Sequence, residues 1–182
     1  MLKKVLIALA AIIAIFVVVV ALQPSEFQLA RSTTIAAPQA DVFAQVNDFH
    51  KWEAWSPWAK LDPQAKIAFE GPPEGEGTIM TWSGNSEVGE GKMTLTESRP
   101  YELIKTRVDM VKPFAGSSTS EFTFKPEGEG TAVTWSVAAH HNFMQKALCL
   151  IFGGKRMMSD LMDKGLAQMK SVVESTPSAS RN

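Results

Sequence analysis

The pattern of hydrophobic and polar positions separates the first 22 residues from the rest of the chain. Positions 1–4 carry two lysines, and positions 5–22 are an uninterrupted run of 18 apolar residues. As a helix rising about 1.5 Å per residue, this run spans about 27 Å, close to the roughly 30 Å of a bilayer's hydrocarbon core. The apolar stretch of a cleaved signal peptide is shorter, about 7–15 residues. We therefore expect residues 1–23 to form an uncleaved transmembrane anchor; a cleaved signal peptide and a buried core helix are the alternatives.

The positive charges predict how this anchor is oriented. Lys3, Lys4 and the amino terminus precede the apolar run, whereas the nearest charged residues after it are Glu26 and Arg31. The positive-inside rule places the lysine-bearing end in the cytoplasm. We expect a single-pass protein of the inner (cytoplasmic) membrane, held through residues 5–22, with a periplasmic or extracytoplasmic domain.

The domain begins with a strand-type pattern followed by two helix-type patterns. Segment 27–35 alternates apolar and polar residues, as a half-buried strand does. Pro38 is well placed to open a helix, and Val42, Phe43, Val46 and Phe49 then recur at helical spacing. A second short helix should contain Trp52 and Trp55 and end near Ser56, because the residue before a proline disfavours helix.

The remainder predicts a meander of strands and a closing helix. Glycine and proline breaks separate six alternating segments, at 66–70, 78–83, 91–98, 103–110, 117–125 and 131–139. Short consecutive strands joined in this way form an antiparallel sheet. A helix interrupted at Gly153-Gly154 follows, with apolar positions at helical spacing up to Val173. We take residues 24–175 as one domain and expect the small, polar residues 176–182 to be disordered.

Charge and cysteine content narrow the function classes. Without Lys3 and Lys4, 16 of the 18 basic residues remain against 19 acidic ones, a net charge of −3 with no basic cluster. Binding to phosphate backbones needs such a cluster, so we expect no nucleic acid partner. The single cysteine, Cys149, cannot form an internal disulfide, and its apolar surroundings predict a buried, inert thiol.

The order of elements and four motifs resemble a known superfamily. A strand, two short helices, six strands and a long helix is an α+β order similar to the helix-grip fold of the SRPBCC (START-like, birch-pollen-allergen-like) superfamily. More closely, the chain resembles bacterial polyketide cyclase/dehydrase and lipid-transport-like proteins with an N-terminal anchor. The matching segments are Ile35-Ala36-Ala37-Pro38 with Val42-Phe43, the tryptophan cluster 52–58, Gly75-Glu76-Gly77 before Trp82, and 130–135. The resemblance implies a curved sheet of about seven strands wrapped on the C-terminal helix, with a ligand cavity between them.

Strand alternation identifies the side chains that should line such a cavity. Residues two apart on a strand share a face, and the closing helix contributes methionines, which adapt to irregular partners. Thr106, Ser118 and Ser120 would be the sparse polar groups that apolar pockets use. The expected ligand-binding residues are Trp55, Trp58, Met80, Trp82, Met93, Leu95, Thr106, Val108, Ser118, Ser120, Phe122, Phe124, Trp135, Met158, Met162 and Met169. A tightly packed core without a cavity is the alternative.

The tryptophan cluster allows three interpretations. Trp52 and Trp55 lie three residues apart and share one helix face, whereas Trp58 follows Pro57 and is directed independently. The three indoles could pack the short helices onto the sheet, or Trp55 and Trp58 could line the cavity mouth with a large apolar face and one donor each. A membrane-surface belt is the third interpretation, weakened by the mixed charges that flank the cluster.

Residues for catalysis or metal binding are scarce in the sequence. General base catalysis needs a titratable group on the pocket side, and the predicted inner face has none. His140 and His141 are adjacent, so on a strand they point to opposite faces. Segment 70–77 is rich in glycine but ends without the Gly-Lys-Ser/Thr of a phosphate loop. We therefore assign no catalytic residue, no metal site and no cofactor.

These observations predict a membrane-anchored, extracytoplasmic protein that binds a hydrophobic small molecule or lipid and carries out no chemistry. Two alternatives are a polyketide cyclase/dehydratase-like enzyme that uses the same pocket, and a cell-envelope interaction module without a ligand. Pocket residues suited to the chemistry would favour the enzyme, and full contact between helix and sheet would favour the interaction module.

Overall fold

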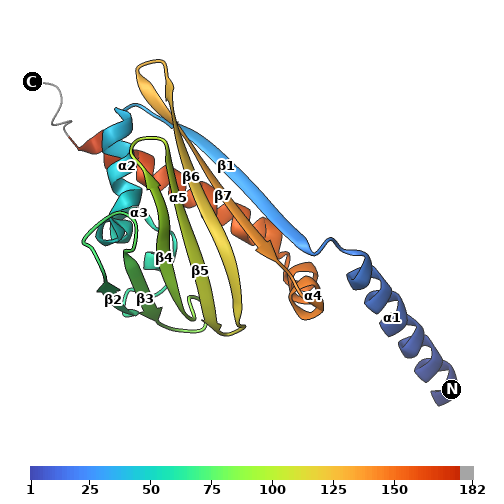
Figure 1. The fold of residues 1–182 in the computed structure, drawn as a ribbon. Helices are drawn as coiled ribbons and strands as arrows, with labels where there is room; N and C mark the ends of the chain where they lie inside the picture. The colour runs from blue at the N-terminus through green and yellow to red at the C-terminus, as the bar shows by residue number, and fades with distance from the viewer. Residues whose placement is uncertain (177–182) are drawn as a thin grey trace, which may run out of the picture.

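The computed structural model describes residues 1–176 (Figure 1). The segment 177–182, which makes up nearly all of the tail expected to be disordered, lies outside the described residues. Helix α1 (Leu2–Leu22) extends away from the rest of the molecule. It is long and apolar enough to cross a membrane, and Val20 is its only buried residue.

Seven strands form one antiparallel sheet in the order β1-β7-β6-β5-β4-β3-β2. The order follows from consecutive hairpins from β2 to β7, with β1 added beside β7. The predicted helix-grip architecture is therefore confirmed. The strands are β1 (Glu26–Ile35), β2 (Lys66–Glu70), β3 (Ile79–Ser83), β4 (Glu90–Arg99), β5 (Leu103–Lys112), β6 (Gly116–Glu127) and β7 (Gly130–His140).

Short helices join β1 to β2 and place the tryptophans against the sheet. Helix α2 (Gln39–Asn47) begins after Pro38 and buries Val42, Phe43 and Val46. It is followed by η1 (Phe49–Lys51), α3 (Trp52–Trp55) and η2 (Trp58–Lys60). Helix α3 ends before Ser56-Pro57, as the proline predicts.

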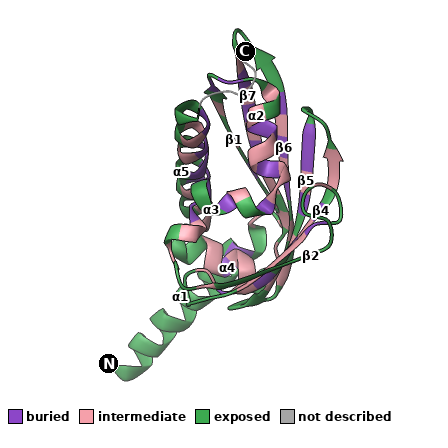
Figure 2. Cartoon of the chain, turned by 90° about the vertical axis from the view of Figure 1, so that its left-hand side faces the viewer, coloured by how far each residue is buried: buried purple, intermediate pink, exposed green. Residues whose placement is uncertain are grey.

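Two helices close the chain on either side of a break at Gly153. Helix α4 (Phe143–Phe152) starts with a capping box, in which Asn142 and Gln145 each bond the other's backbone. Gly153 has φ +63°, a left-handed conformation that ends the helix at little cost only because it has no side chain. Helix α5 (Gly154–Ser175) then crosses the sheet, and Figure 2 shows it facing the strands with α3 seated between them.

A second glycine sets how closely α5 approaches the core. A Cβ added at Gly165 would lie 3.0 Å from Pro57 and 3.1 Å from the ring of Trp135. A side chain at this position would therefore push α5 away from the sheet. The glycine lets the helix backbone rest directly on the tryptophan that belongs to β7.

The strands agree closely with the sequence prediction, with small differences at their ends. Most are longer than expected by one or two residues at one or both ends, because ladder pairing continues into the polar flanks that alternation alone leaves out. One expectation is wrong: Cys149 is partly exposed and not buried. Its apolar neighbours Leu150 and Ile151 are exposed as well.

Candidate ligand site

The register of the sheet arranges the inner-face side chains in rows that run across the strands. One row pairs Phe69, Met80, Met93, Val108 and Ser118 from β2 to β6. Two residues further along, a second row pairs Leu95, Thr106, Ser120 and Val137, and a third contains Ile104, Phe122 and Trp135. The predicted strand residues therefore do share one face. We call the first row and Trp82 the open half of the inner face, and the other two rows the closed half.

The closed half is filled by side chains from the helices. Trp55 is fully buried, with its ring centroid 6.1 Å from that of Phe122 and 6.0 Å from that of Trp135. Phe122 and Trp135 stack on each other at 4.8 Å. Met162 and Met169 of α5 are also fully buried, and Phe124 nearly so. These predicted site residues are core side chains in this structure, and they could contact a ligand only as the floor of a site.

The open half leaves its side chains partly exposed. Met80, Trp82, Val108 and Met158 pack against the core yet remain partly accessible to solvent. Phe69, at the edge of the sheet, is 38% exposed. Ser118 is also partly accessible, whereas Met93 is buried. Burial therefore increases along the strands, from the open half to the closed half.

One buried polar group at the boundary between the halves has no partner. Thr106 is fully buried, and its Oγ1 makes no hydrogen bond within the described residues. A buried hydroxyl without a partner costs about 1–3 kcal/mol. The neighbouring polar group is satisfied, because the Trp135 indole N–H donates to Ser120 Oγ at 2.7 Å. The three predicted polar groups thus differ: Ser120 is engaged, Ser118 is partly exposed, and Thr106 offers a free buried hydroxyl.

The tryptophan cluster divides between core and edge. Trp52 and Trp55 are buried, and their indole N–H groups donate to the carbonyl oxygens of Val46 and Gln45. Trp55 therefore lies inside the core and not at its rim. Trp58 is partly exposed, with its centroid 5.8 Å from that of Trp135. Of the two indoles expected to line a mouth, only Trp58 is placed to do so.

Sequence reasoning missed Arg31, a charged residue on the inner-face side of β1. Its Nε lies 3.2 Å from Asp163 Oδ2, and a guanidinium nitrogen donates to the buried Ser159 hydroxyl. This contact joins β1 to α5. Arg31 has the same strand parity as Leu29 and Ile35, which was the signal that could have found it.

The histidines occupy the ends of elements. His50 Nδ1 lies 2.9 Å from the Asp48 Oδ1 acceptor, and the His50 ring centroid lies 4.0 Å from that of Phe69. Asp48 also accepts from the His50 backbone N–H, so a capping turn accounts for this pair. His141 stacks on Phe27, and its burial, together with neighbouring His140, lowers its pKa below the ordinary value. Residues 1–176 hold no cluster of three metal-ligating side chains.

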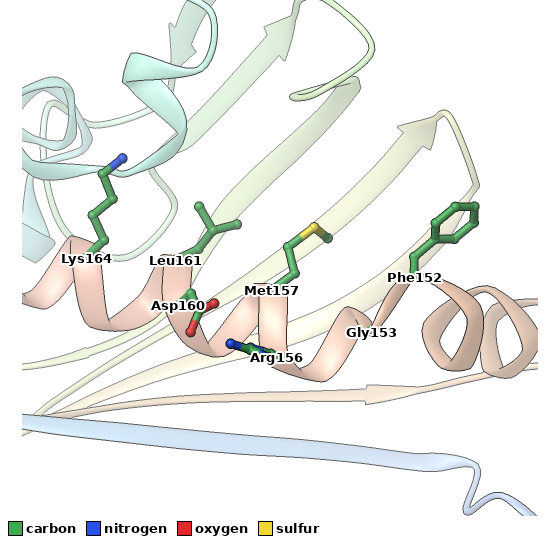
Figure 3. A pocket seen from close by; sticks show the side chains of 7 residues that line it. All are labelled: Phe152, Gly153, Arg156, Met157, Asp160, Leu161 and Lys164. Carbon is green, nitrogen blue, oxygen red and sulfur yellow. The ribbon is translucent and has the colours of Figure 1, made fainter.

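Two hollows on the surface of the described residues bear on where a ligand could bind. One is a groove of about 450 Å³ at the α4–α5 junction, where Phe152, Met157, Leu161 and Lys164 point to the same side of the helices (Figure 3). The other, of about 410 Å³, lies over β2, β3 and β4 and includes Trp82 and Val111. Neither hollow is lined by residues of both α5 and the sheet. The open half of the inner face is thus a partly exposed surface.

Solved structures share this fold at low sequence identity. Protein MLL2253 from Mesorhizobium loti is 15% identical and matches with a TM-score of 0.60 over 84% of this chain and 100% of its own. The di-domain ARO/CYC BexL from the BE-7585A biosynthetic pathway is 16% identical, with a TM-score of 0.62 over 87% of this chain and 53% of its own. Ara h 8.0201 is 11% identical, with a TM-score of 0.57 over 83% and 99% of the two chains. At these identities the likeness concerns the fold alone.

The family comparison covers almost the whole domain. No curated protein matches the sequence. A family model described as polyketide cyclase / dehydrase and lipid transport matches residues 26–174, which run from the first residue of β1 to the last turn of α5. Helix α1 lies outside this match. The chain therefore belongs to the polyketide cyclase / dehydrase and lipid transport family, of SRPBCC type.

Proposed function

We propose that this protein binds a hydrophobic small molecule or lipid on the open half of its inner face. The observation that carries the proposal is Thr106, a fully buried hydroxyl without a partner beside partly exposed apolar side chains. Buried polar groups are almost always hydrogen-bonded. A ligand polar group that reaches past Val108 would supply the missing partner.

The residues of the open half favour an apolar ligand with few polar atoms. Phe69, Met80, Trp82 and Val108 offer aromatic and aliphatic surface, and Met158 adds a flexible thioether from α5. Ser118 and Thr106 are the polar groups beside them. Such a lining, mostly apolar with sparse polar groups, is typical of small-molecule sites.

The same lining supports binding over the enzyme alternative. The inner-face rows hold no carboxylate, lysine or histidine that could act as a general base. Arg31 is engaged by Asp163 and Ser159 and holds α5 in place. Trp135, Phe122 and Ile104 fill the closed half with packed side chains. We therefore assign these residues to support of the site.

We further propose that α1 anchors the domain in a membrane, with the domain on the extracytoplasmic side. Residues 5–22 are all apolar, and Val20 is the only residue of α1 that is buried, which favours an anchor over a core helix. The lysines at positions 3 and 4 favour a cytoplasmic amino terminus. A tethered binding domain of this kind would handle lipids or other apolar molecules at the membrane surface.

Thr106→Val tests the ligand site. Removing an unpaired hydroxyl should leave the ligand-free protein as stable as the parent or more stable by about 1 kcal/mol, because no bond is lost. A dansyl-labelled fatty acid, followed by energy transfer from tryptophan, should bind the variant about fivefold more weakly, which corresponds to one neutral hydrogen bond. Thr119→Val, an exposed change on the opposite face of β6, is the matched control.

Three results are informative in this experiment. Saturable binding by the parent that weakens only in Thr106→Val supports the site. Equal affinities in all three proteins would move the ligand away from Thr106. A parent that binds no fatty acid, with no lipid found by mass spectrometry in the purified full chain, would favour the envelope-interaction alternative.

A further inference from the structure

Exposed apolar side chains gather at the end of the domain where α1 ends. Most of the exposed large apolar residues after Leu22, among those the structure describes, lie there; Ile67, Phe69 and Tyr101 are elsewhere. The exposed fractions of these side chains at this end of the domain run from 42% to 71%. We call this set the membrane-proximal face: Val111 and Phe114 on the β5–β6 hairpin, Phe143, Met144, Leu150, Ile151 and Phe152 on α4, and Met157 on α5.

Direct contacts hold α4 at the point where α1 ends. The two helices are in contact, and Val20, near the end of α1, is fully buried. The ammonium group of Lys146 donates to the carbonyl oxygens of Ala21 and Gln23 at 3.3 and 3.0 Å. Helix α4 also contacts the β5–β6 hairpin, because Gln145 Nε2 donates to Ala115 O at 3.4 Å. Helix α4 therefore bridges the anchor and the β5–β6 hairpin (Figure 1).

The charges on this segment have one sign. Between Phe143 and Met157 the charged residues are Lys146, Lys155 and Arg156, with no acidic residue among them. Lys155 and Arg156 are exposed at the start of α5. Arg156 also lines the groove with Phe152 and Met157 (Figure 3). Apolar and aromatic residues beside cationic ones are the composition of helices that lie in a membrane interface.

We infer that α4 is an interfacial helix whose membrane-proximal face lies in the headgroup region of the bilayer that holds α1. This inference rests on the proposed anchoring. A span that ends at Leu22 leaves α4, bonded to Ala21 and Gln23, at the depth of the interface. Soluble proteins rarely expose large contiguous apolar patches, and those that do occur mark protein or membrane contacts. The cations next to it would meet anionic lipid headgroups.

The arrangement also directs the open half of the inner face toward the bilayer. The β5–β6 hairpin continues from the strand ends that carry Val108 and Ser118, and it is the hairpin that Gln145 contacts. Met110 and Gly116 form its last pair. A lipid could then pass from the membrane interface to Thr106 along one end of the sheet, without crossing water.

Fluorescence quenching in the full chain tests the position of α4. Single cysteines are introduced in a Cys149→Ala background and labelled with an environment-sensitive NBD dye. Ile151→Cys reports on α4, Ile13→Cys on α1, and Glu129→Cys on the exposed β6–β7 turn at the far end of the domain. The proteins are reconstituted in nanodiscs of phosphatidylcholine and phosphatidylglycerol, with a doxyl quencher either high on the acyl chain or near its end.

The inference predicts a different result at each position. The α1 label should lose most emission with the deep quencher, the α4 label should shift to the blue and lose most emission with the shallow quencher, and the Glu129 label should respond to neither. An α4 label that behaves like the Glu129 label, beside a quenched α1 label, would overturn the inference and leave the anchor intact. A blue-shifted but unquenched α4 label would also overturn it, because a protein surface would then cover the face. An unquenched α1 label would reject the anchor and, with it, the interfacial helix.

Discussion

Thr106 and Trp135 lie in neighbouring inner-face rows, and each has a buried polar group, but only that of Trp135 has a hydrogen-bond partner in the described part of the chain. The Trp135 indole donates to the Ser120 hydroxyl in the closed half, and this bond fixes the ring against which α3 and α5 pack. Thr106 pairs with Ser120 across β5 and β6, yet its own hydroxyl finds no partner among the described residues. The hydroxyl at position 106 is therefore the group that, under the proposed function, a ligand would reach.

His141 predicts a pH dependence of stability. Burial, with the adjacent His140, lowers the pKa of His141 below its ordinary value of about 6.5. The unfolded chain then binds more protons than the native state, so this residue's contribution to stability is present above pH 6.5 and falls as the pH drops below it. His141→Gln should show a smaller loss of unfolding free energy than the parent between pH 7.5 and about 5.

Denaturant titration measures the unfolding free energy at each pH, and the NMR signal of the His141 ring measures its pKa. His140→Gln separates the two causes, because it removes the neighbouring histidine and leaves His141 buried, so the loss should shrink by less than in His141→Gln. The stacked ring of Phe27, 4.9 Å from His141, would instead favour the charged form if a cation–π contact dominated. An NMR pKa above the ordinary value would therefore reverse the predicted slope.

For single residues, the sequence predicted which face of the sheet a side chain lies on better than it predicted whether that side chain is exposed. Alternation correctly placed the predicted strand residues on one face of the sheet. It did not distinguish Trp55, which is buried, from Trp58, which is partly exposed, because exposure depends on which helix covers each position. Arg31 was overlooked because a charged residue is not expected on the inner face. Its partners Asp163 and Ser159 lie more than a hundred residues away in the sequence, so no local pattern pointed to them.

Helix α5 presents two methionines in different environments, which gives a matched pair of substitutions. Met162 is fully buried in the closed half, whereas Met158 is partly exposed. Met162→Trp should cost about 1–3 kcal/mol of unfolding free energy through overpacking. Met158→Trp adds volume at a partly exposed position, so stability should change by less than about 1 kcal/mol, while the dansyl fatty acid is displaced if Met158 borders the proposed site.

Denaturant unfolding and the same energy-transfer titration read out both variants. Each variant serves as the other's control, because both add one indole to the same helix. Equal destabilisation by the two substitutions, with unchanged fatty acid affinity, would mean that α5 is packed uniformly and that Met158 does not border a ligand site.

At the element scale the strands and the helix break at Gly153 were predictable from the sequence, whereas the exposure of α4 was not. Period-two alternation between glycine and proline breaks locates strands because both signals are local. Helix α4 lies in an apolar run, and apolar runs are usually buried, which led to the wrong expectation for Cys149. Helix α4 is exposed because it packs against the end of α1 and not under the sheet, and a local sequence pattern carries no information about that contact.

The whole molecule has two ends with different properties. The closed half, with α2, α3 and the later turns of α5, is filled with aromatic and aliphatic side chains. The other end combines the open half, the membrane-proximal face and the last turn of α1. Motifs in the sequence identified the fold, but whether helix and sheet touch or leave space is decided by side-chain volumes across long sequence separations, such as Gly165 against Trp135.

If α1 is the membrane anchor that we propose, its orientation decides on which side of the membrane the open half lies. Lys3 and Lys4 precede an apolar span whose only buried residue is Val20. With the amino terminus held inside by these charges, a C-terminal alkaline phosphatase fusion should be active and a cytoplasm-dependent fluorescent fusion dark. Replacing both lysines with glutamate should reduce phosphatase activity, because the charge bias across the span is lost. A bright fluorescent fusion beside an inactive phosphatase would put the domain in the cytoplasm, and the interfacial helix would then lie on the inner leaflet.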